Sequence, residues 1–400
     1  MFKEINCCRV CYSTNIDPIL SLGDLAVSDF MDNPSCEGLV APLELVLCNK
    51  AEGGCGLLQL KHTVSDEAMF RNYWYLSGIN QAMTDELSDI TRSVCEVASI
   101  DAKDYVVDIG SNDGTLLRSY QIEGLNTVGF EPARNLEKYG SQGTSKIIVD
   151  FFSYDSWVDT FGDKKAKIIT AIGMFYDLED PSKFIADAAE ALEHDGVFIA
   201  QLMCLNSMLK KNDLGNICHE HLEFYSYESL KYLFEKNGFK IFKVEENNIN
   251  GGSYRIYCKK NIKKSIIHKE NIGIKEIKKF FSRVKENKHK FNKFVIKAKK
   301  EKKKIFLYGA STKGNTLLQY YDINSKIIPF AAERSPEKWG KYTIGTGVKI
   351  ISEKEARKLN PDYFFVMPYA FINEFKKRES KWLKTGGKFL LPYPSFRVVK

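Results

Sequence analysis

The polar run Cys218-His219-Glu220-His221 contains side chains suited to acid and base chemistry. Two of the six histidines of the chain stand here, and imidazole is the side chain that titrates near neutral pH. We expect His221 or His219 to remove a proton, with Glu220 or a backbone carbonyl orienting the ring. Two other interpretations stay open: a metal site, which would need ligands from elsewhere in the chain, and surface histidines without a catalytic role.

Cysteine spacing near the N-terminus predicts a metal centre. Cys8 and Cys11 form a Cys-x2-Cys pair, and Cys48 and Cys55 can complete a set of four thiolates around a tetrahedral ion. A site closed by four cysteines has no position for water, so we expect one structural zinc ion per chain. From spacing alone, Cys7 remains an alternative to Cys8.

A glycine turn in the middle of the chain predicts a nucleoside site. The apolar run 105–109 leads into Gly110 and Gly114, and glycines let the backbone approach a ligand closely. Glu131 ends the next predicted strand, where an acid can accept hydrogen bonds from both ribose hydroxyls. The turn lacks the Gly-x-Gly-x-x-Gly spacing that suits a pyrophosphate, which favours S-adenosylmethionine over NAD. The residues expected to contact this cofactor are Asp108, Gly110, Ser111, Asn112, Gly114, Glu131, Asp150 and Gly173.

The elements predicted around this turn follow the order of a class I methyltransferase, a Rossmann-like α/β fold. A strand, a glycine turn and further parallel strands come first, and a hairpin around Asn-Asn-Ile-Asn-Gly-Gly closes the sheet. The expected strands are 105–109, 126–131, 147–150, 167–172, 197–201, 239–244 and 253–258, with helices at about 182–193 and 227–236.

A second strand, glycine turn and helix start occur at 304–314. Ser311 and Lys313 stand where a helix N-terminus can bind an anion, so we expect this Rossmann-like α/β unit to hold a phosphate-bearing substrate. Dimerisation or a purely structural role is the alternative. The aromatic run 70–78, which precedes the first glycine turn, either contacts substrate or packs against the next domain.

Length and charge place these sites in a chain of several domains. Its 400 residues divide into a zinc module (1–66), a methyltransferase domain (67–260), a basic linker helix (261–303) and a C-terminal domain (304–400). The net charge of +7 is concentrated in residues 259–304, which carry +15 and leave about −8 for the rest. We therefore expect a solvated lysine face on the linker helix rather than a surface for nucleic acid or membrane.

No apolar run approaches the roughly 18 residues of a membrane helix. The first residues, Met-Phe-Lys-Glu-Ile-Asn-Cys, contain no apolar segment typical of a secretion signal. We expect a cytoplasmic, monomeric protein whose ten cysteines are mostly reduced.

Over essentially its whole length the chain resembles the zinc-containing nucleotide-sugar C-methyltransferases that act on keto-deoxysugars. The motifs that carry this resemblance are, in order, the four cysteines with Cys55-Gly-Leu-Leu-Gln-Leu60, Tyr73-x-Tyr75-x-Ser77-Gly78, Asp108-Ile-Gly-Ser-Asn-Asp-Gly114, His219-Glu-His221 with Tyr225, Gly251-Gly-Ser-x-Arg255, Tyr308-Gly-Ala-x-x-Lys-Gly-Asn315-x-Leu-Leu-Gln319 and Arg334-Ser-Pro-x-Lys338-x-Gly340-Lys341. The resemblance implies a structural zinc ion, S-adenosylmethionine in the middle domain, and the nucleotide of a sugar substrate held largely by the C-terminal domain. The substrate contacts that we assign from it are Tyr73, Ser77, Arg255, Ser311, Lys313, Asn315, Arg334 and Lys341.

Two residues depart from the pattern of that family. Cys218 stands where the family has tyrosine, and Tyr176 aligns with a catalytic histidine. A phenol with a pKa near 10 is a poorer base than histidine at pH 7, so proton removal falls to the pair of histidines. Tyr75, Tyr176 or Tyr225 can donate a hydrogen bond to an enolate oxygen.

These observations favour methylation of a ring carbon of a nucleotide-linked ketosugar through an enolate. The two altered positions leave open O- or N-methylation of a related nucleotide sugar by the same scaffold. They also leave open a binding protein whose inactive methyltransferase domain docks on a partner in glycan assembly.

Overall fold

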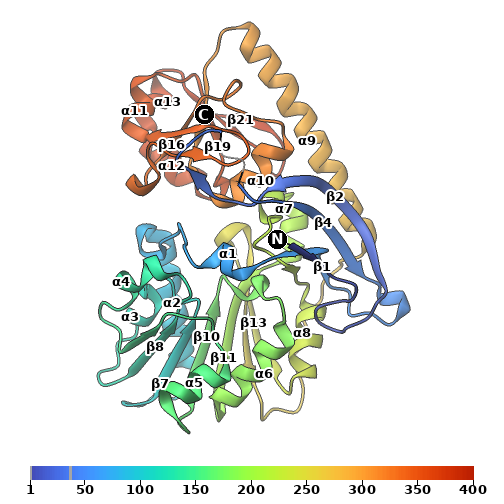
Figure 1. The fold of residues 1–400 in the computed structure, drawn as a ribbon, viewed down its shortest axis with the longest axis vertical. Helices are drawn as coiled ribbons and strands as arrows, with labels where there is room; N and C mark the ends of the chain where they lie inside the picture. The colour runs from blue at the N-terminus through green and yellow to red at the C-terminus, as the bar shows by residue number, and fades with distance from the viewer. Residues whose placement is uncertain (1, 36–37) are drawn as a thin grey trace.

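The computed structural model of the chain describes residues 2–35 and 38–400. Two lobes lie one above the other in Figure 1, with the middle domain below and the C-terminal domain above. N-terminal strands lie beside the junction of the lobes, and the long helix α9 (Ile274–Lys300) runs along the outside of the C-terminal lobe. Within the described residues, no helix is both long enough and apolar enough to cross a membrane.

The middle domain is built on a seven-stranded sheet with the order β13-β14-β11-β10-β7-β8-β9. The strands from β11 to β9 are parallel, and β14 is antiparallel to both of its neighbours. This is the strand order of a class I methyltransferase, which confirms the predicted fold. The strands are β7 (Tyr105–Ile109), β8 (Asn126–Phe130), β9 (Lys146–Ile148), β10 (Ala166–Ile172), β11 (Leu192–Met203), β13 (Lys240–Asn247) and β14 (Ser253–Lys259).

Both faces of this sheet are buried, which explains why its central strands are continuous apolar runs. Val107 and Ile169 pack into the largest hydrophobic cluster, whereas their neighbours Val106 and Ile168 pack into a second cluster. The second cluster also includes side chains of α2. The helices of this domain are α2 (Gln81–Val97), α3 (Thr115–Arg118), α4 (Glu137–Gly140), α5 (Tyr154–Phe161), α6 (Pro181–Ala191), α7 (Leu205–Lys211) and α8 (Tyr227–Lys236).

The turn after β7 requires glycine at two positions. Gly110 and Gly114 have φ values of +70° and +77°, a region that side chains with a Cβ rarely adopt. A Cβ on Gly110 would lie 2.9 Å from Met174 Cγ, and one on Gly114 would lie 2.9 Å from the carbonyl oxygen of Gly140. The two glycines therefore let the chain pass closely between β10 and α4.

The C-terminal domain contains an eight-stranded sheet with the order β21-β20-β19-β15-β16-β18-β17-β3. Its five central strands are parallel, which gives a second Rossmann-like unit, as predicted. The strands that this domain supplies are β15 (Ile305–Tyr308), β16 (Phe330–Glu333), β17 (Tyr342–Thr343), β18 (Lys349–Ser352), β19 (Tyr363–Val366), β20 (Lys388–Leu391) and β21 (Arg397–Val399). Its helices are α10 (Thr312–Tyr320), α11 (Glu353–Lys358), α12 (Ile372–Arg378) and α13 (Ser380–Lys384).

The N-terminal module shares strands with both other domains. Its antiparallel sheet has the order β12-β5-β4-β2, in which β12 (Glu223–Phe224) belongs to the middle domain. The eighth strand of the C-terminal sheet, β3 (Phe30–Met31), comes from this module and pairs with β17. The remaining elements are β1 (Phe2–Glu4), β2 (Ile16–Ala26), β4 (Val40–Cys48), β5 (Leu58–Leu60), β6 (His62–Val64) and α1 (Asp66–Phe70).

The basic linker contains one helix, α9, which has one packed face and begins at Ile274 rather than at residue 261 as predicted. Phe280, Val284 and Phe291 are buried, whereas most of its lysines are exposed. Arg283 donates to the carbonyl oxygen of Leu209 at 2.6 Å, and Asn287 donates to that of Pro392 at 3.2 Å. The helix thus contacts both the middle and the C-terminal domain.

Candidate active site

A cavity of about 610 Å³ lies where the carboxyl ends of the middle-domain strands meet the C-terminal domain. Its walls come from the turn after β7, the ends of β8 and β10, the aromatic run 70–78, and residues near 311–317 and 367–371. This volume falls within the roughly 300–1,000 Å³ of small-molecule sites. Open α/β sheets bind their ligands at the same edge.

Glu131 is held at one end of the cavity by two backbone donors. Asn112 N–H donates to its Oε2 and Ala133 N–H donates to its Oε1, each at 2.8 Å. Burial raises the pKa of this carboxyl, which lines the cavity together with Gly110 and Gly173. Each carboxylate oxygen keeps a further lone pair, so the side chain can still accept hydrogen bonds from two neighbouring hydroxyls.

Three predicted cofactor contacts, Asp108, Ser111 and Gly114, lie behind the cavity wall rather than in it. Asp108 is buried, accepts a hydrogen bond from Thr170 Oγ1 at 2.7 Å, and has its pKa raised by burial to about 7. Gly114 begins α3. These residues shape the turn, whereas Asp150 does line the cavity.

The segment 73–78 lies against the glycine turn. Ser77 N–H donates to Asn112 Oδ1 at 2.9 Å, and Asn112 Nδ2 donates to the carbonyl oxygen of Tyr75 at 3.0 Å. The side chains of Tyr73, Tyr75 and Ser77 line the cavity. Asn112 therefore joins segment 73–78 to the glycine turn after β7.

His221 lines the cavity with a ring in one defined orientation. Its Nδ1 donates to the carbonyl oxygen of Asn216 at 2.7 Å. Burial, and then the charge of Lys313, lower the pKa of the imidazole well below its ordinary value. Because a carbonyl can only accept, Nδ1 carries the proton and Nε2 keeps a free lone pair at neutral pH.

Tyr176 lies directly against this histidine. The centroids of the two rings are 4.5 Å apart with their planes nearly perpendicular, and the carbonyl oxygen of Tyr176 accepts from Leu222 N–H at 2.8 Å. Burial raises the pKa of the phenol well above 10. Tyr176 is thus a neutral hydrogen-bond donor beside an imidazole that can accept a proton.

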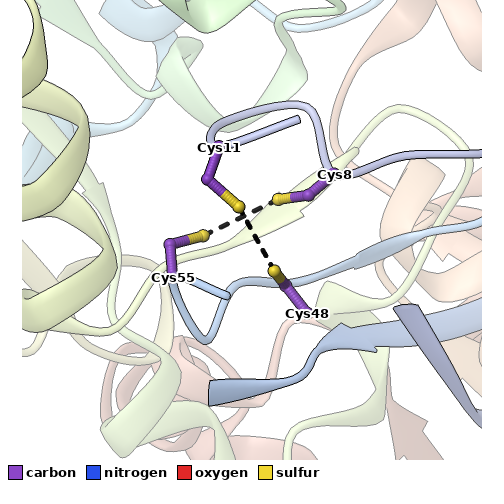
Figure 2. A group of neighbouring side chains, drawn as sticks. All are labelled: Cys8, Cys11, Cys48 and Cys55. Carbon is purple, nitrogen blue, oxygen red and sulfur yellow. Dashed lines mark hydrogen bonds between the residues drawn. The ribbon is translucent and has the colours of Figure 1, made fainter. Parts of the chain in front are cut away.

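The four predicted cysteines of the metal centre lie together (Figure 2). The sulfur atoms of Cys8 and Cys55 are 3.6 Å apart, those of Cys11 and Cys48 are 3.4 Å apart, and all four lie within 4.8 Å of one another. Zinc–sulfur bonds of about 2.3 Å in a tetrahedron place the sulfurs at similar separations. The donor set fits one zinc ion, and Cys7 is not part of it.

Families of known proteins match this chain in the order of its domains. Residues 8–70 match a family described as “Putative zinc binding domain”, residues 79–244 match a methyltransferase domain, and residues 248–394 match a “C-methyltransferase C-terminal domain”. A curated protein, C-methyltransferase NovU from Streptomyces niveus, is 25% identical over 99% of this chain and 97% of its own length. The chain is thus similar to a C-methyltransferase over its whole length and contains a zinc-binding module and a methyltransferase domain. Its activity is therefore that of a methyltransferase dependent on S-adenosylmethionine.

Solved structures overlap only part of this methyltransferase. The magnesium protoporphyrin IX methyltransferase ChlM from Synechocystis PCC 6803 with bound SAM is 11% identical, covering 49% of this chain and 97% of its own, with a TM-score of 0.36. The cyclopropane synthase MmaA2 from Mycobacterium tuberculosis is 16% identical, covering 46% and 74%, with a TM-score of 0.33.

Three predicted catalytic side chains of the methyltransferase do not line the cavity. His219 points towards the N-terminal module, where its Nε2 contacts the carbonyl oxygen of Ala41 at 3.0 Å. Tyr225 is fully buried against Phe175, with ring centroids 5.7 Å apart. Glu220 is buried next to His221 but does not contact its Nδ1, because Asn216 supplies the orienting carbonyl. The predicted catalytic roles of His219 and Tyr225 are therefore not supported.

Arg255 was expected to contact substrate, but its guanidinium is occupied within the fold. Nη2 donates to Glu86 at 2.7 Å, Nη1 donates to Asp89 at 2.9 Å, and Nε donates to Gln201 at 2.9 Å. The side chain is buried and does not line the cavity. Its position on β14 joins the sheet to α2, so its role is structural.

The C-terminal domain contributes two of its five predicted substrate residues to the cavity, Ser311 and Lys313. Lys313 Nζ donates to Asn216 Oδ1 at 3.3 Å, next to the histidine. The other three are engaged elsewhere: Asn315 donates to the carbonyl oxygen of Asp29, Arg334 is exposed opposite Glu374, and Lys341 pairs with Asp32.

Asp177 and Asp213 are two of the carboxyl groups at the cavity that were not predicted from the sequence. Asp177 follows Tyr176, and burial together with Glu220 raises its pKa well above its ordinary value. Asp213 accepts a hydrogen bond from Tyr369 at 3.2 Å, and burial raises its pKa to about 6. Asp177 could have been found from its place after a strand, whereas nothing in the sequence distinguishes Asp213.

Proposed function

We propose that the chain methylates a ring carbon of a nucleotide-linked ketosugar. The observation that carries this proposal is the neutral imidazole of His221, which lines a cavity enclosed by two Rossmann-like domains and keeps a free lone pair on Nε2. S-adenosylmethionine, when bound, supplies an electrophilic methyl group. Glu131 would hold its ribose, with Gly110, Asn112, Asp150 and Gly173 around it.

A ring carbon becomes nucleophilic only after it loses a proton, and near pH 7 this requires a neighbouring ketone. In the proposal, His221 Nε2 accepts that proton while Nδ1 remains bonded to the Asn216 carbonyl. The enolate oxygen needs a donor, and the phenols of Tyr176 and Tyr73 face the same cavity. Both phenols have pKa values raised by burial, so they stay protonated and can donate.

The other end of the substrate would lie against the C-terminal domain. Lys313 stands in the first turn of α10 and lines the cavity. A lysine at a helix N-terminus suits a phosphate group. In the proposal, a nucleotide diphosphate would lie on α10 and the sugar between His221 and the cofactor end; Lys313 supports this arrangement.

O- or N-methylation remains the second candidate because Tyr176 stands where a histidine base would be expected. Transfer to oxygen or nitrogen needs no carbanion, because the heteroatom already carries a lone pair. Such a reaction needs only one group to accept the proton of the heteroatom. The two reactions differ in whether a carbon-bound proton is removed.

Proton exchange tests the proposal directly. Nucleotide 4-ketosugars incubated in D2O with enzyme and S-adenosylhomocysteine should exchange a proton adjacent to the ketone, as followed by NMR. His221→Asn should abolish exchange while retaining affinity for S-adenosylhomocysteine. The matched control is His219→Gln, which changes a histidine outside the cavity and should keep exchange. A product methylated on oxygen or nitrogen, without exchange at carbon, would refute C-methylation.

A further inference from the structure

The turn from Cys218 to His221 brings three metal-binding side chains to one point. His221 N–H donates to the Cys218 carbonyl oxygen at 3.2 Å, which closes the turn. The Cys218 sulfur, a Glu220 carboxylate oxygen and a His221 ring nitrogen then lie within 4.8 Å of one another. The intervening His219 points the other way, towards Ala41. The sequence does not show which side chains of residues 218–221 point to the same side, because this depends on the geometry of the turn.

All three side chains are buried with few protein partners. Cys218 is fully buried, Glu220 is 6% exposed and His221 is 3% exposed. Among the described residues, the Glu220 carboxylate makes no hydrogen bond with the protein, and the Cys218 sulfur has only the backbone N–H of His221 beside it. Burying such groups without partners is unfavourable, and a bound ion is one way in which proteins satisfy them.

Charge around the turn also favours a cation. Glu220 and Asp177 face the same region, and Asp177 Oδ1 is buried without a partner. Lys313 is the positive group facing this cluster, but its Nζ donates to Asn216 Oδ1 at 3.3 Å. The positive charge of Lys313 acts on both carboxyl groups, so one ammonium group faces two carboxyl groups and a thiol.

We propose that Cys218, Glu220 and His221 form a second metal site, distinct from the four-cysteine centre. One thiolate, one carboxylate and one imidazole suit a borderline-soft divalent ion such as Zn²⁺. Three protein ligands leave a coordination position open, and the His221 side of the site faces the cavity. Binding would release the thiol proton of Cys218 to solvent.

The site has a consequence for the reaction, which rests on the proposed function. The ion and the carbon-bound proton would compete for the same lone pair, His221 Nε2. Excess Zn²⁺ should therefore inhibit proton exchange, and loss of Cys218 should relieve that inhibition. Metal binding itself does not depend on the proposed reaction.

Cobalt titration tests the site. Enzyme that retains its tightly bound zinc should take up one further equivalent of Co²⁺ and develop a thiolate-to-cobalt absorption band in the near ultraviolet. Cys218→Ser should abolish that band and weaken binding by at least about tenfold, the loss that even outer-shell changes produce. Cys204→Ser is the matched control, because Cys204 is another fully buried cysteine, and its sulfur only caps α7.

Glu220→Gln provides a second variant in case the serine variant fails to fold, with S-adenosylhomocysteine affinity as the check on folding. It should weaken cobalt binding but keep the thiolate band at saturation. The proposal is overturned if the wild type binds no further equivalent, or if Cys218→Ser binds cobalt as the wild type does. Absence of proton exchange before any Co²⁺ is added, in a protein that afterwards binds cobalt at Cys218, would instead count against the proposed reaction alone.

Discussion

Replacing Glu131 with alanine should weaken binding of the cofactor product, S-adenosylhomocysteine. Both carboxylate oxygens accept backbone hydrogen bonds at 2.8 Å, and their remaining lone pairs face the cavity. A hydrogen bond to a charged group contributes about 1.5–3 kcal/mol. Loss of that amount corresponds to a roughly ten- to hundredfold weaker affinity. Isothermal titration calorimetry measures it directly, and unchanged affinity would refute a role for Glu131 in binding ribose.

A second ligand separates ribose binding from support of the glycine turn. The wild type should lose affinity for a 2′,3′-dideoxy analogue, and Glu131→Ala should bind that analogue about as well as the wild type does. An equal loss for both ligands would show that Glu131 acts only by holding Asn112 and Ala133. Glu137→Ala, at an exposed position on α4, is the matched control and should bind both ligands normally.

Two further predictions concern stability. Arg255→Met should lower the free energy of unfolding by about 3 kcal/mol in urea titrations, because it removes the charged partner of Glu86, which then keeps only the neutral Asn247 as a donor; adding Glu86→Gln should restore part of this loss, and no loss would contradict a structural role. Asp108 has a pKa raised from 3.8 to about 7, so the native state retains its proton where the unfolded state loses it. Its contribution to stability is complete below about pH 4 and falls as pH rises towards 7, by at most about 4 kcal/mol. Asp108→Asn keeps an acceptor for Thr170 and should therefore become progressively more stable than the wild type between pH 4 and pH 7; a constant difference would contradict the raised pKa.

The sequence was informative where a pattern is local or repeats with a fixed period. The spacing of Cys8 and Cys11 reflects how two thiolates share one ion, and the structure brings them to Cys48 and Cys55. Apolar runs such as 105–109 indicated strands buried on both faces, and their order predicted the sheet.

The sequence was less informative about the direction in which individual side chains point. His219 and His221 are two residues apart and equally suited to base chemistry, yet the turn directs one towards Ala41 and the other into the cavity. Arg255 was misassigned because its partners on α2 are distant in sequence. Asp213 was not predicted, because it lies at the cavity only through packing of the two domains, in which Tyr369 of the C-terminal domain contacts it.

The strand β3 makes the order of chain synthesis matter for this fold. Phe30 and Met31 emerge from the ribosome long before Tyr342 and Thr343, with which they pair to complete the C-terminal sheet. Until then, β3 has no partner in that sheet, and a C-terminal domain expressed alone would leave the β17 edge unpaired and available to another chain. β3 and β17 therefore reach their final structure together, and the cavity between the two lobes forms only after both have been synthesised.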